Sequence, residues 1–111
     1  MIEEIILKYL KERLSVPVCM KKPEEEPEKY VLIEKIGGSK SEHILSASIA
    51  LQSYADSLYS AVDLDDELRG VMDDIVELDI IVSAKLVRNY NHTDTTKKKH
   101  RYQSVYELVH Y

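Results

Sequence analysis

The pattern of apolar and polar positions predicts two amphipathic helices. In the first, apolar residues recur three or four positions apart, and the helix is expected to end before Pro17 because a residue preceding proline is disfavoured in helical conformation. Its stripe contains Ile2, Ile5, Ile6, Tyr9, Leu10 and Leu14. A second stripe predicts a helix within residues 56–79, N-capped by Asp56 or Ser57. It contains Leu58, Ala61, Val62, Leu68, Val71, Met72 and Ile75. We expect its acidic residues to lie mostly outside the stripe, and Gly70 to mark a close approach or a kink.

Three strands are expected between the helices, counting a short one at residues 16–20 that Pro17 places at a sheet edge. Residues 30–36 are rich in strand formers, and Gly37-Gly38-Ser39 is expected to end this strand in a hairpin or bulge turn. Residues 45–52 alternate apolar and small or polar side chains, so we expect them to pair with it as a hairpin.

Two further strands are expected after the second helix. The first covers residues 80–90, with Ile80, Val82, Ala84 and Leu86 on one face, and a polar loop at 91–100 leads to the last strand at 101–111. The order is α-β-β-β-α-β-β. It predicts one domain over residues 1–111, of class α+β, with a mainly antiparallel sheet and two helices packed on one face.

Charge is distributed unevenly along the chain. The net charge is −5, but residues 56–79 carry nine acidic side chains against Arg69 alone, whereas residues 80–111 carry six basic against two acidic. We therefore predict that the acidic helix of one copy meets basic groups of the next, and that added salt weakens the oligomer. Candidate interface residues are Asp63, Asp66, Asp73 and Asp74, with Tyr102 and Tyr106 of the last strand. A solvated acidic face is the plainer alternative.

No pattern indicates catalysis, a metal site or a cofactor. Cys19 is the only cysteine, which excludes an internal disulfide and a multi-cysteine metal site, and we interpret it as a small buried side chain. His92, Asp94 and His100 share a polar loop without metal-ligand spacing. We expect no enzyme activity, no small-molecule substrate and no membrane span.

The single dense basic cluster lies in the last loop and the start of the last strand. It contains Lys97, Lys98, Lys99 and Arg101. Such a cluster can touch phosphates without sequence preference, whereas an ordinary solvated loop tip is the alternative.

Two segments together carry a family resemblance. One is the proline-bracketed linker, strand and Gly-Gly turn at residues 23–38, and the other is the closing strand that begins Arg101-Tyr102-Gln103. With the order of elements, they resemble the small tail-terminator, or tail-completion, proteins of long-tailed bacteriophages and prophages. The resemblance spans nearly the whole chain, and its motifs are structural rather than catalytic.

The resemblance implies a virion structural protein of the tail and neck, present in the bacterial host cytoplasm during assembly. Such proteins form a ring, commonly a hexamer, that ends polymerisation of the tail tube and presents a surface for head-tail joining. The implied partners are further copies of the chain, the tail tube protein and the head-tail connector proteins. DNA passing through the ring would transiently contact Lys97, Lys98, Lys99 and Arg101. Another neck component, such as a head-closure or stopper protein, and a small nucleic-acid-binding adaptor domain remain the alternatives.

Overall fold

The computed structural model describes residues 1–111 and confirms the α+β class and the order of elements. The helices are α1 (Ile2–Arg13), α2 (Leu58–Met72) and a short 3₁₀ helix, η1 (Ile75–Glu77). The strands are β1 (Val18–Cys19), β2 (Tyr30–Ser41), β3 (Ile44–Ala55), β4 (Ile81–Asn91) and β5 (His100–His110). They form one sheet in the order β1-β2-β3-β5-β4, and only the β1–β2 pair is parallel.

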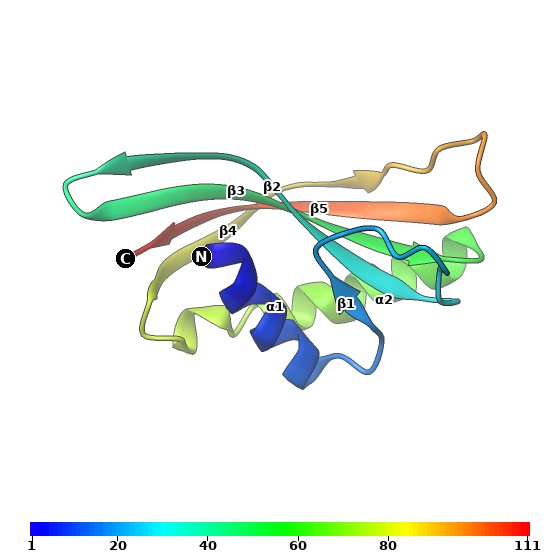
Figure 1. Ribbon diagram of the computed structural model, residues 1–111, viewed down its shortest axis with the longest axis horizontal. Helices are drawn as coiled ribbons and strands as arrows, with labels where there is room; N and C mark the ends of the chain where they lie inside the picture. Colours follow the sequence, from blue (N-terminus) through cyan, green and yellow to red (C-terminus); the bar gives the residue numbers. More distant parts are fainter.

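Both helices lie on the same face of the sheet, as expected (Figure 1). The molecule measures 44 × 25 × 24 Å. The β2–β3 hairpin tip and the loop between β4 and β5 lie at opposite ends of its long axis (Figure 1). Neither helix is long and apolar enough to cross a membrane.

The first helix follows its sequence pattern closely. Its stripe buries Ile6 and Leu10 completely, while Ile5 is half-buried. The helix ends at Arg13, ahead of Pro17 as predicted. With β3, β5 and α2 it encloses the apolar core between helices and sheet.

The second helix begins as expected, is shorter than predicted and buries most of the predicted stripe, including Ala61, Leu68 and Met72. The Ser57 hydroxyl accepts a hydrogen bond from the Ser60 N–H at 3.1 Å, so Ser57 is the cap. Leu64 is buried, whereas Leu58 is exposed. The close approach expected at Gly70 is wrong, because a Cβ there would meet no atom within 4 Å.

The Gly-Gly segment does not end its strand. β2 continues to Ser41, and the hairpin turns instead at Glu42 and His43, whose φ angles of 47° and 72° suit a two-residue turn. The bulge that we predicted is confirmed as a register shift between Lys35 and Gly37. A Cβ on Gly38 would lie 2.9 Å from the backbone oxygen of Ser46, so this close approach requires glycine.

The predicted face of the penultimate strand is confirmed for Ile80 and Ala84, which pack against the core, and for Leu86, which pairs with the core residue Tyr106, but it is wrong at Val82. Register shifts between Ile81 and Ser83, and between Leu86 and Arg88, change which side chains face the helices. Ile81 therefore enters the core, while Val82 is 49% exposed. Each bulge adds a residue and so reverses the alternation on which the sequence pattern depends.

Candidate functional site

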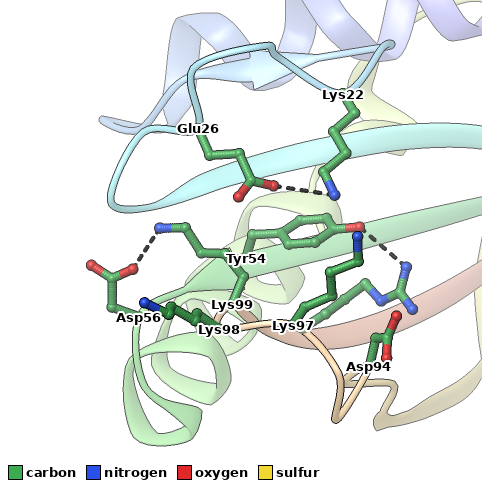
Figure 2. Close-up of a pocket in the computed structure, with 9 residues that line it drawn as sticks. Lys22, Glu26, Tyr54, Asp56, Asp94, Lys97, Lys98 and Lys99 are labelled. Atoms are coloured by element: carbon green, nitrogen blue, oxygen red, sulfur yellow. Dashed lines mark hydrogen bonds and ion pairs between the residues drawn. The ribbon is translucent and has the colours of Figure 1, made fainter.

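A basic pocket of about 220 Å³ lies at the end of the sheet where the loop 92–99 joins β4 to β5 (Figure 2). Its walls come from three segments: the linker before β2, the end of β3, and the loop with the start of β5. The basic side chains are Lys22, Lys97, Lys98, Lys99 and Arg101, and the acidic ones are Glu26, Asp56 and Asp94. The structure thus places the whole predicted basic cluster around one hollow.

Lys99 is tied into the fold rather than presented to solvent. Its side chain is 13% exposed, and Nζ lies 2.6 Å from Asp56 Oδ1. The same ammonium group donates to the carbonyl oxygens of Pro27 at 2.8 Å and Glu28 at 2.9 Å. Lys99 therefore fastens the linker to the end of β3, and its three donors are already used.

Arg101 is also engaged within the subunit. Its Nε donates to the His92 carbonyl oxygen at 2.7 Å, and Nη1 donates to the Tyr54 hydroxyl at 3.1 Å. The Tyr54 ring in turn stacks on Tyr30, with centroids 4.6 Å apart. Arg101 thus holds the loop against a buried aromatic pair.

The linker side of the pocket is anchored through Glu26. Its carboxylate accepts a hydrogen bond from the Tyr30 hydroxyl at 2.8 Å and lies 3.3 Å from Lys22 Nζ. The Tyr30 hydrogen bond, followed by the positive charge of Lys22, lowers the pKa of Glu26 below its usual range. An ionised Glu26 offsets Lys22, which leaves Lys97 and Lys98 as the pocket's free cations.

The side chains of Lys97 and Lys98 are free because other residues hold the conformation of the loop. Asp94 Oδ1 accepts hydrogen bonds from the Thr96 N–H at 2.9 Å and from its hydroxyl at 2.6 Å. These bonds, with the charges of Lys97 and Arg101, lower the pKa of Asp94. Lys97 and Lys98 are exposed and form no ion pair. Such a surface can attract a phosphate or a carboxylate by its charge.

The predicted interface residues separate into two groups. Asp66, Asp73 and Tyr106 line a groove of about 450 Å³ between α2 and β4. Asp63 and Asp74 are exposed elsewhere, and Tyr102 is half-buried on β5. Tyr106 is only 4% exposed, so it can contribute to a contact only through the part that faces the groove.

Sequence reasoning missed the buried carboxylate of Asp65. Its side chain is fully buried, with Oδ2 accepting from Arg69 Nε at 2.9 Å and from Asn89 Nδ2 at 2.8 Å. Oδ1 accepts from the Ser104 hydroxyl at 2.6 Å. The only signal in the sequence was the four-residue spacing of Asp65 and Arg69. The network joins α2 to β4 and β5 and so fixes the groove between them.

No metal-binding cluster accompanies these surfaces. No three His, Cys, Asp or Glu side chains are placed to share a metal ion. Cys19 is half-buried, its thiol donates weakly to the Val31 carbonyl oxygen at 3.6 Å, and burial raises its pKa.

Comparison with known proteins adds no relative: no protein-family model and no curated protein matches the chain. A functional interpretation therefore depends on the fold, on the two charged surfaces and on the resemblance in the sequence.

Proposed function

We propose that the chain is a structural protein of the tail-terminator type, which self-associates head to tail into a ring and caps the tail tube of a long-tailed bacteriophage. The order of elements agrees with the resemblance, and the fold class has the expected form. In this proposal the protein acts by binding further copies of itself and by capping the end of the tail tube.

One observation carries the proposal: opposite charges occupy separate places on the same subunit. Acidic side chains are exposed along α2, while Lys97 and Lys98 are exposed on the loop 92–99 at the end of the sheet. Lysines on a projecting loop and carboxylates on a helix favour contact between two different surfaces of two copies. Repeated contacts of this kind form a closed ring when the rotation between copies closes.

The sheet edges favour association through side chains rather than through added strands. β4 is an edge strand, and β2 is covered by β1 over only two paired residues. However, β4 carries two register shifts and the charges of Lys85 and Arg88, and bulges and charges are the usual protection against uncontrolled strand pairing. A ring with a defined number of subunits fits such protected edges.

The proposal is tested by light scattering after size-exclusion chromatography at several protein concentrations and two salt levels. Negative-stain imaging with tail tubes of the phage that encodes the chain completes the test. We expect rings, either free or only on tube ends, and fewer of them at high salt. A monomer that ignores tube ends at every concentration would overturn the proposal.

The basic pocket supports a second candidate, a nucleic-acid-binding adaptor, through its two free lysines. The variant Lys97→Glu with Lys98→Glu tests it, and Lys99 is left intact because it ties the linker to β3. An adaptor would bind duplex DNA at low salt and lose this binding in the variant. Lys8→Glu with Lys11→Glu on α1 is the matched control, since both lysines are exposed.

A further inference from the structure

We infer that the groove between α2 and β4 is the docking site for a lysine from the loop 92–99 of a second copy. The inference rests on the head-to-tail association proposed above and names the two surfaces that meet. The groove has a volume of about 450 Å³ and is open to solvent.

The chemistry of the groove matches a lysine side chain. Met72, Ala84 and Leu86 supply an apolar lining, and Asp66 and Asp73 place carboxylates on it. A lysine has an aliphatic stem that packs on apolar surface and an ammonium group that seeks carboxylates. The only basic lining residue, Arg69, is already bound to Asp65 and Asp66, so Asp73 is the groove carboxylate that has no ion pair within the subunit.

Tyr106 provides an observation that is independent of the acidic residues. It is 4% exposed and lines the groove. The polar network beside it joins Asp65, Asn89 and Ser104 and does not include the Tyr106 hydroxyl. The hydroxyl makes no hydrogen bond within the subunit and is open to solvent, so an incoming ammonium group can donate to it in place of water.

Gly70 leaves the entrance to the groove open. It lines the groove, and a Cβ added there would meet no atom within 4 Å. A long side chain at this position of α2 would reach into the space that the lysine needs, whereas a Cβ alone meets no atom. Glycine therefore lowers helix stability here without being required by packing inside the subunit.

The occupant is a second copy rather than the same chain. The strand from Leu86 in the groove to Asn91 at the loop spans about 16 Å, which is farther than a lysine side chain reaches. Lys97 and Lys98 are exposed, and they lie on a loop that projects from the end of the sheet (Figure 1). A projecting loop can enter a neighbour's groove, whereas the exposed lysines of α1 lie on a helix surface.

Disulfide trapping between two variants tests the contact even when it is weak. In a Cys19→Ser background, one protein carries Gly70→Cys, which keeps both groove carboxylates, and the other carries Lys98→Cys, which keeps Lys97. We expect the mixture to cross-link about fivefold faster than a mixture of Gly70→Cys with Lys11→Cys, the difference expected for roughly 1 kcal/mol of pairing. Lys11 is an exposed lysine on α1 and serves as the matched control.

A second change separates a specific contact from random collision. Adding Asp66→Asn and Asp73→Asn to the Gly70→Cys protein should reduce cross-linking to the control rate. Cross-linking that equals the control from the start, or that is unaffected by these two substitutions, would overturn the inference. Rings on tube ends without this cross-link would refute the docking site alone, and the cross-link without tube capping would refute the proposed function alone.

Discussion

The buried carboxylate of Asp65 gives the most direct test of how the subunit is held together. In the variant Asp65→Ala, Arg69 Nε loses its acceptor at 2.9 Å and the Ser104 hydroxyl loses its acceptor at 2.6 Å. Asn89 loses one partner but keeps the Ser104 hydroxyl at 2.8 Å. Breaking a buried ion pair from one side usually costs about 3–5 kcal/mol.

Two features of the structure reduce that cost. The Arg69 side chain is 35% exposed and keeps its ion pair with Asp66, so its charge is not stranded in the core. Asn89 also retains an acceptor. We therefore expect Asp65→Ala to lower the free energy of unfolding by about 2–4 kcal/mol, a large part of the 5–15 kcal/mol typical of a domain.

The neighbouring residue Asp66 is the matched control for this measurement. It contacts the same arginine, but its side chain is 58% exposed. Asp66→Ala should therefore cost less than about 1 kcal/mol. Urea unfolding followed by circular dichroism measures both variants. Equal losses for the two, or a loss below about 1 kcal/mol for Asp65→Ala, would refute the reasoning.

Three further predictions concern single positions. Gly70→Ala should raise the free energy of unfolding by about 0.5–1 kcal/mol in thermal melts, because its Cβ meets no atom within 4 Å. Burial, followed by the charge of Asp73, raises the pKa of Tyr106 to about 12. The unfolded tyrosine therefore loses its proton first, and stability falls by up to about 3 kcal/mol as pH rises from about 10 to about 12. Tyr106→Phe should remove that part of the fall in urea titrations at about pH 9 and about pH 11. Lys99→Met should cost about 1–3 kcal/mol because its bonds to Asp56 and two carbonyls are lost, while Lys97→Met should stay within about 0.5 kcal/mol.

The sequence was sufficient for the elements whose patterns are local. The stripe of α1 follows from one face being buried, so the helix was predicted correctly, and the pairing of β2 and β3 as a hairpin was also predicted correctly. The half-buried character expected of β3 was wrong, because residues 49–55 are buried on both faces of the sheet. The Gly37-Gly38 segment failed as a strand end because its glycines serve a bulge and a close approach to Ser46, which depend on the partner strand. The prediction for β4 failed at Val82 for the same reason, because the bulge there depends on the pairing with β5.

The sites were less predictable because several of their charged side chains are paired with residues that are distant in the sequence. Lys99 has the same sequence context as Lys97 and Lys98, yet only Lys99 meets Asp56, Pro27 and Glu28. Nothing local distinguishes the lysine that fastens the fold from those that remain free. Composition can locate a basic loop, but the number of free charges depends on which partners the tertiary structure brings to it.

The crowded carboxylates of α2 predict opposite salt effects on the subunit and on its assembly. Folding holds Asp63, Asp66 and Glu67 on one exposed helix surface, and the single cation among them, Arg69, is already paired. Screening this repulsion should make the isolated subunit more stable as salt rises. The same screening should weaken a contact between α2 and the loop lysines of a second copy. Urea unfolding of dilute protein and cross-linking of the Gly70→Cys and Lys98→Cys pair, measured over one salt series, should therefore move in opposite directions. If the free energy of unfolding of the subunit falls with salt, as the cross-linking is expected to do, then the carboxylates of α2 do not repel one another enough to destabilise the subunit. In that case a second copy would not act by relieving this repulsion.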